Sequence, residues 1–128
     1  MTCFWDALIR ELQIDNERHI ILGNYTNPVD LVNCLKSKNT NTNNITWQDE
    51  ILGEKQKEEN YEWIKTYNES NINNGHLTST ADPFLILISF LMDIKIILNY
   101  CNSEIIISPP VNKIRYTIKL NNSNSHMS

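Results

Sequence analysis

The feature that most constrains the fold is an apolar segment in the second half of the chain. Phe84 to Met92 is apolar at almost every position, and Asp82-Pro83 precedes it. An element without a polar face has to be covered on all sides, so the rest of the chain must surround it. Asp followed by Pro is typical of a helix start, and the Leu and Met content also favours a helix. A buried strand is the alternative.

Three more helices are predicted from apolar residues spaced three or four positions apart. The first opens the chain, with Thr2 as its cap and an apolar stripe along one side. The second begins at Asn27-Pro28, another cap followed by proline. The third covers residues 46–67, unless Gly53 divides it.

The last third of the chain predicts a β-sheet. Two runs rich in β-branched residues, 95–100 and 104–108, flank a short polar turn and predict a hairpin. From Ile114 to Leu120, apolar and polar residues alternate, as in a strand with one buried face. Helices first and strands last indicate an α+β fold, with N-terminal helices packed on a small C-terminal β-sheet. The length of 128 residues fits a single domain, 1–128.

Charge and cysteine content exclude several classes of protein. The net charge of -4 offers no basic surface for nucleic acid or an anionic membrane, and the longest apolar run is about half of a membrane span. The three cysteines are widely spaced without a CxxC pair, which argues against a disulfide scaffold and a structural zinc site. Residues 1–20 lack the pattern of a signal peptide. We therefore expect an intracellular monomer that needs no metal or cofactor.

Two residues near the ends of the chain are candidates for thiol chemistry. Cys3 lies at the start of the first predicted helix, where unpaired N–H groups and the helix dipole favour the thiolate. A lone cysteine is more often a small buried hydrophobe. His126 follows the last predicted strand through a polar loop, where it can serve as a general base, although a frayed terminal histidine is the alternative. Together, a cysteine on a helix and a histidine after a late strand match the papain-like proteases.

The other cysteines and histidines have weaker settings. Cys34 falls within a predicted helix and Cys101 in a predicted turn, so both are expected to be structural or incidental. His19 and His76 lie in polar connectors. None of these four has a neighbour in the sequence that suggests chemistry.

Three short motifs resemble those of the ovarian-tumour (OTU) family of thiol proteases. Residues 3–8, Cys-Phe-Trp-Asp-Ala-Leu, are similar to the OTU nucleophile motif, in which an aromatic residue or Leu and then Ala-Leu follow the cysteine. Residues 74–98 resemble the OTU middle segment, where a loop precedes a buried helix that leads into a central strand. Ile114 to Leu120, followed by Ser-His-Met at 125–127, resembles the terminal strand and histidine motif. Together these motifs span nearly the whole chain.

The resemblance implies a papain-like OTU domain that cleaves bonds to the C-terminus of ubiquitin or a ubiquitin-like modifier. Cys3 would be the nucleophile and His126 the general base, and the backbone N–H of Cys3 would help to hold the oxyanion. Trp5 would either wall the channel for the modifier's tail or pack in the core. Because the chain is rich in Asn and Ile, which AT-rich codons encode, we expect a large DNA virus or a similar genome as its source. The protein would then be located in the cytoplasm or nucleus of the host cell.

Two departures from the family pattern favour an alternative function. The family usually has Asp-Gly before the cysteine, whereas Met1 and Thr2 precede Cys3 here. The family often orients its histidine with Asp or Asn two residues later. That position is Ser128 here, and Asn124 is the other candidate for an orienting residue. The alternatives are an OTU-like fold that binds ubiquitin or another protein without cleaving it, and an interaction domain unrelated to OTU proteins.

Overall fold

A computed structural model describes residues 3–68, 82–100, 103–123 and 126–127 of the chain. Helices and strands are both present, which confirms the predicted α+β class. In chain order the elements are α1 (Cys3–Leu12), α2 (Arg18–Leu22), α3 (Pro28–Ser37), β1 (Thr46–Trp47), β2 (Glu50–Ile51), α4 (Glu54–Thr66), α5 (Asp82–Met92), β3 (Lys95–Tyr100), β4 (Ser103–Ser108), the 3-10 helix η3 (Val111–Lys113), β5 (Thr117–Ser123) and β6 (His126–Met127). Because β1 and β2 lie between helices, the order is less segregated than the sequence predicts.

The described strands form one six-stranded sheet in the order β2-β1-β4-β3-β5-β6. Strand β3 pairs antiparallel with β4, where Ile96 is opposite Ile107, and this confirms the predicted hairpin. On its other side β3 pairs parallel with β5, where Ile96 is opposite Ile118. The last strand, β6, pairs antiparallel with β5, where His126 is opposite Ser123. The sheet therefore brings His126 next to the end of β5.

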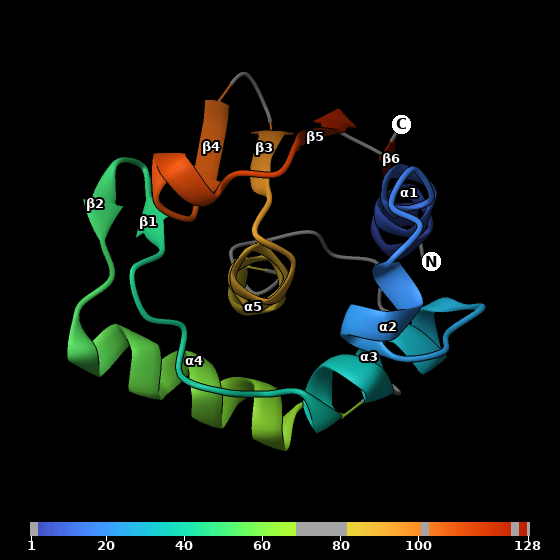
Figure 1. The fold of residues 1–128 in the computed structure, drawn as a ribbon, viewed down its shortest axis with the longest axis horizontal. Coiled ribbons are helices and arrows are strands. Elements are labelled where there is room, and N and C mark those ends of the chain that lie inside the picture. The colour runs from blue at the N-terminus through green and yellow to red at the C-terminus, as the bar shows by residue number, and fades with distance from the viewer. Residues whose placement is uncertain (1–2, 69–81, 101–102, 124–125, 128) are drawn as a thin grey trace.

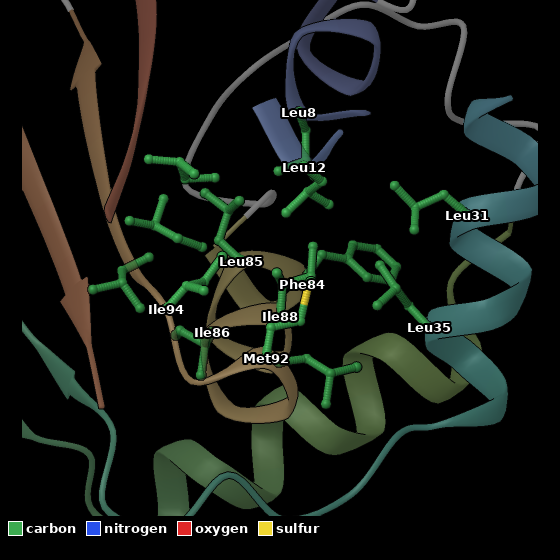
Figure 2. Close-up of a cluster of buried hydrophobic side chains, with 14 of the residues drawn as sticks. Leu8, Leu12, Leu31, Leu35, Phe84, Leu85, Ile86, Ile88, Met92 and Ile94 are labelled. Atoms are coloured by element: carbon green, nitrogen blue, oxygen red, sulfur yellow. The ribbon is translucent and has the colours of Figure 1, made fainter. Parts of the chain in front are cut away.

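Helix α5 lies at the centre of the fold, between the sheet and the other helices (Figure 1). The predicted helix over Phe84–Met92 is confirmed, and the strand alternative is wrong. The side chains from Phe84 to Ile88 are all buried. Figure 2 shows Leu8 from α1 and Leu35 from α3 on different sides of this helix. Coverage from several directions is what a helix without a polar face requires.

The segment before α4 contradicts the prediction of one helix over residues 46–67. Strands β1 and β2 form an antiparallel hairpin with a two-residue loop instead. The loop residues Gln48 and Asp49 have φ angles of 55° and 68°. Positive φ at both central residues is typical of a type I′ turn, for which Asn-Gly or Asp-Gly is the usual sequence signal. Gly53 is not a break within a helix but the N-cap of α4, and its N–H donates to Gln56 Oε1 at 3.1 Å.

Replacing Asp49 by glycine is expected to raise the free energy of unfolding by about 0.5–1 kcal/mol. A residue with a side chain is strained at positive φ, and glycine is not. Gln48, the other turn residue, is not substituted, because its side chain holds the hairpin. Its amide oxygen accepts from Ile106 N–H at 3.1 Å, and its amide nitrogen donates to the Glu104 carbonyl at 2.9 Å. Urea denaturation measures the change. The control Glu50→Gly, at a strand position, should destabilise the chain, and an Asp49→Gly chain no more stable than wild type would contradict the turn assignment.

Other element boundaries agree with the sequence in part. The side chain of Asn27 accepts a hydrogen bond from the third residue after it, at 2.9 Å, and so caps α3 as predicted. Helix α2, which begins at Arg18, is not predicted from the sequence. The last long strand begins at Thr117 rather than at Ile114. The predicted alternation is confirmed further along, since Ile118 is buried and its neighbours are exposed.

Candidate functional site

Cys3 is the first residue of α1. Its backbone belongs to the described part of the chain, and its side chain does not. The start of a helix offers backbone N–H groups without intrahelical acceptors and the positive end of the helix dipole. The backbone at Cys3 therefore has the features that stabilise a thiolate or an oxyanion.

His126 lies in β6, beside the end of β5. Helix α1 packs against both β5 and β6, and α1 and β6 lie side by side in Figure 1. The helix that begins at Cys3 and the strand that contains His126 are therefore neighbours. The side chain of His126 is not among the described ones, so the contact between thiol and imidazole stays a prediction.

Several residues considered in the sequence lie outside the described residues, among them Thr2, the expected cap of the first helix. They include both candidates for orienting the imidazole, Asn124 and Ser128, and the weaker candidates His76 and Cys101. Their roles remain as the sequence predicts them.

Cys34 and His19 have structural surroundings. The Cys34 thiol donates a hydrogen bond to the carbonyl oxygen of Asn24 at 3.4 Å, and burial raises the pKa of this thiol. A neutral thiol that is held in this way is a poor nucleophile. His19 Nδ1 lies 3.3 Å from the carbonyl oxygen of Gly23, and its ring centroid is 5.0 Å from that of Tyr25.

Trp5 is part of the core. The residue is 6% exposed, and its ring meets Phe84 edge to face with centroids 5.3 Å apart. A residue that lines a substrate channel needs an accessible face. Of the two roles considered for Trp5, core packing is therefore the one that its burial supports.

A charged cluster that the sequence does not predict lies just beyond the C-terminal end of α1. The carboxylate of Asp15, which is 4% exposed, accepts a hydrogen bond from Nη2 of Arg115 at 3.1 Å, and its other oxygen forms an ion pair with Nη1 at 3.0 Å. It also accepts from the hydroxyl of Tyr116 at 2.8 Å and from the N–H of Glu17 at 2.9 Å. We call Asp15, Arg115 and Tyr116 the Asp15 clamp. A two-pronged contact between a guanidinium and a carboxylate fixes orientation as well as distance.

The Asp15 clamp joins three elements. Arg115 also donates to the carbonyl oxygen of Met92, the last residue of α5, at 2.9 Å. The backbone N–H of Arg115 donates to the carbonyl oxygen of Asp93 at 2.8 Å. A cation at the C-terminus of a helix is favoured by the helix dipole. The end of α1, the end of α5 and the chain that leads into β5 are thus held at one point.

The contacts within the clamp determine its ionisation. Burial alone would raise the pKa of Asp15, but the hydrogen bonds that the carboxylate accepts, first of all from Arg115, hold it below its ordinary value. Burial and the hydrogen bond to Asp15 raise the pKa of the Tyr116 hydroxyl. The hydrogen bond to Asp15 also raises the pKa of Arg115. At neutral pH the clamp is therefore a carboxylate, a guanidinium cation and a neutral phenol.

The sequence carries little signal for this cluster. The side chains of Asp15 and Arg115 are separated by 100 positions in the chain. Asp15 lies in a polar run, and Arg115 occupies a polar position of the alternating strand pattern. Both are therefore expected on the surface when each is considered with its neighbours alone.

A pocket of about 250 Å³ lies where α4 meets the β1–β2 hairpin and the start of α5. Its wall combines apolar and polar side chains, namely Trp47, Leu52, Gln56, Glu59, Asn60, Pro83 and Ile86. Glu59 is the charged member of this wall. Pockets for drug-sized ligands have about 300–1,000 Å³, so this one suits a single side chain or a small fragment.

The described residues contain no group of three or more His, Cys, Asp and Glu side chains placed to hold a metal ion. Within the described ranges, none of the helices combines the length and the apolar character that crossing a membrane requires. No model of a known protein family, no curated protein and no solved structure matches the chain. Its own residues and their arrangement are therefore the basis for assigning a function.

Proposed function

We propose that the chain is a thiol hydrolase with a papain-like OTU fold that cleaves ubiquitin or ubiquitin-like conjugates through Cys3 and His126. The observation that carries this proposal is the packing of α1, which begins at Cys3, against β6, which contains His126. A nucleophile at a helix N-terminus beside a histidine on a late strand is the arrangement of papain-like proteases. The α+β class is compatible with it.

The directions of the chain support this pairing. The Asp15 clamp holds the C-terminal end of α1 at the start of β5, and α1 packs against β5 and β6. From the clamp, the helix leads back toward Cys3 while the strand leads forward to Ser123. Helix and strand therefore extend to the same side of the molecule. His126 is paired with Ser123, so its backbone lies at this far end.

The proposed reaction consists of two acyl transfers. The Cys3 thiolate attacks the carbonyl carbon at the modifier's C-terminus, and the His126 imidazolium protonates the departing amine as the C–N bond breaks. Water then attacks the thioester and gives a proton to the neutral imidazole, and the thiolate and the modifier's carboxylate are released. The backbone N–H of Cys3 is the expected donor to the oxyanion. This chemistry needs neither a metal nor an organic cofactor.

A reducing compartment suits this chemistry, because a free thiol is not lost there to disulfides. We therefore place the protein inside the cell, in the host cytoplasm or nucleus if its source is a virus. Its expected partner is ubiquitin or a related modifier, bound by a monomer.

Covalent capture of ubiquitin with a C-terminal vinyl methyl ester tests the proposal. The wild-type chain is expected to form a stable adduct, and Cys3→Ala none, because the adduct requires the Cys3 thiolate. His126→Ala should slow capture by a factor of about 100 or more, the usual contribution of a general base. A gel shift and intact-protein mass spectrometry measure the adduct.

The matched control is Cys34→Ser. This thiol is half-buried and bonded to the Asn24 carbonyl, so its replacement should leave capture unchanged. If Cys3→Ala, or a chain that lacks residues 125–128, captured the electrophile at the wild-type rate, Cys3 and His126 would be excluded as the reacting pair.

The second candidate is a non-catalytic OTU-like module that binds ubiquitin or another protein. The pocket beside α4 favours it, because an apolar wall next to Glu59 can take the stem and the charged head of a partner's basic side chain. Saturable binding of unmodified ubiquitin without capture of the electrophilic form would support the module. Capture that depends on Cys3 would support the hydrolase.

A further inference from the structure

The Asp15 clamp holds the C-terminal end of helix α1. Cys3 begins this helix, and Asp15 lies three residues beyond its last residue, Leu12. Nine steps at a rise of about 1.5 Å each separate Cys3 from Leu12 by about 14 Å. A rotation of the helix by about 4° at its C-terminal end would therefore move Cys3 by about 1 Å. Displacements of this size at a reacting group can lower a rate by as much as about 100-fold.

The apolar contacts of α1 and the Asp15 clamp hold the helix to different parts of the molecule. Leu8 and Leu12 are fully buried and hold the helix against the core around α5 (Figure 2). The clamp combines a hydrogen bond and an ion-pair contact from the guanidinium with a hydrogen bond from the phenol, at 2.8 to 3.1 Å, on one buried carboxylate. Its partners come from the chain that leads into β5, the strand beside β6. The clamp thus sets α1 relative to the part of the sheet that carries His126.

We propose that Asp15, Arg115 and Tyr116 are positioning residues that hold the Cys3 end of α1 opposite His126. This inference rests on the proposed function, since it assigns the clamp a role in that same site. The clamp touches no reacting atom, and it acts through the orientation of α1. A clamp variant that remains folded should therefore lose rate because its thiol and imidazole are misplaced.

The first experiment measures proximity without any enzymatic activity. In a chain with Cys34→Ser and Cys101→Ser, His126→Cys leaves two thiols, at positions 3 and 126, which should form a disulfide under mild oxidation. Adding Asp15→Asn, which keeps the shape of the side chain and removes its charge, is expected to slow this disulfide about tenfold. Tyr116→Phe, which removes one hydrogen bond, should slow it about twofold. Arg10→Gln, an exposed charge on α1, is the matched control and should leave the rate unchanged.

The second experiment measures the Cys3 thiol with His126 in place. The rate of alkylation by iodoacetamide is measured as a function of pH. In Asp15→Asn the midpoint of this profile should move to higher pH, because the imidazolium is no longer close enough to stabilise the thiolate. Capture of the ubiquitin electrophile should slow about tenfold in the same variant. Circular dichroism at the assay temperature establishes that each variant is folded, so that unfolding is not the cause.

The outcomes separate the two proposals. Failure of the disulfide in the chain with an intact clamp would place Cys3 and His126 apart and overturn the proposed function. A disulfide, an alkylation profile and a capture rate that are all unchanged by Asp15→Asn in a folded chain would overturn the positioning role and leave the hydrolase standing. Slower disulfide formation with a shifted alkylation profile supports both.

Discussion

Replacing Phe84 by alanine is expected to lower the free energy of unfolding by about 4–5 kcal/mol. Phe84 is fully buried, and three aromatic rings meet it edge to face with centroid distances of 5.3 Å for Trp5, 5.4 Å for Trp63 and 5.1 Å for Tyr67. Large-to-small substitution of a buried Phe costs about 3–5 kcal/mol, and the loss of three edge-to-face contacts puts this variant in the upper part of that range. The total stability of a domain is about 5–15 kcal/mol, so this variant should be near the limit of folding.

Urea denaturation, followed by circular dichroism and tryptophan fluorescence, measures this loss. Phe84→Leu keeps most of the volume and should cost clearly less than Phe84→Ala. Ile20→Ala, at a side chain that is 80% exposed, should change stability by no more than about 0.5 kcal/mol. A loss below about 2 kcal/mol for Phe84→Ala would contradict the central position of this ring in the core.

Replacing Arg115 by alanine is expected to cost about 2–3 kcal/mol at neutral pH. The variant leaves the buried Asp15 carboxylate without its cation and the Met92 carbonyl without its donor. Removal of one partner from a fully buried ion pair costs about 3–5 kcal/mol, and the Arg115 side chain is 34% exposed, which reduces the expected loss. Arg10→Ala, an exposed arginine on α1, should be almost neutral.

The cost of Arg115→Ala should depend on pH with a definite sign. The pKa of Asp15 is lowered in the folded chain from its ordinary value of 3.8, so the ionised carboxylate stabilises the fold above that value. This contribution is lost as the pH falls through the lowered folded pKa of Asp15. The difference in unfolding free energy between wild type and Arg115→Ala should therefore be largest above about pH 4 and shrink toward pH 2. A difference that is constant over this range would contradict the assigned ionisation.

The central helix could be predicted because its signal is local. The segment from Phe84 to Met92 has almost no polar residue on any side, so it must be buried in any fold of the chain. Asp82-Pro83 marks the start of the helix. The strand pattern from Ile114 to Leu120 is local in the same sense. The pattern places the start of this strand three residues too early, because Arg115 and Tyr116 continue the alternation while their side chains bind Asp15.

The β1–β2 hairpin could not be predicted from its residues. Type I′ turns are recognised by Asn-Gly or Asp-Gly, and Gln48-Asp49 lacks the glycine at the second position. The hairpin is stabilised from outside, since β1 pairs with β4 and the Gln48 side chain bonds the backbone at Glu104 and Ile106. These contacts join parts of the chain that are more than 50 positions apart, which no local pattern reveals.

The sequence proposes Cys3 and His126 as site residues, and this stays a prediction. Each follows a local rule, a helix start and a position after a late strand. The Asp15 clamp follows no local rule, because a buried carboxylate is recognised only with its partner, and Arg115 is 100 positions away. Whether the thiol and the imidazole meet is a matter of side-chain placement, which the disulfide experiment addresses.

The packing of α1 against β5 and β6 has a consequence for how the protein is made. Helix α1 is synthesised first among the elements, while β5 and the residues of the clamp that bind Asp15 are synthesised more than 90 positions later. Until they emerge from the ribosome, the apolar side of α1 around Leu8 and Leu12 lacks part of its cover. Contacts between segments so distant in sequence also slow folding. The nascent chain should therefore expose this helix to chaperones until β5 has emerged from the ribosome, and become protease-resistant only after that.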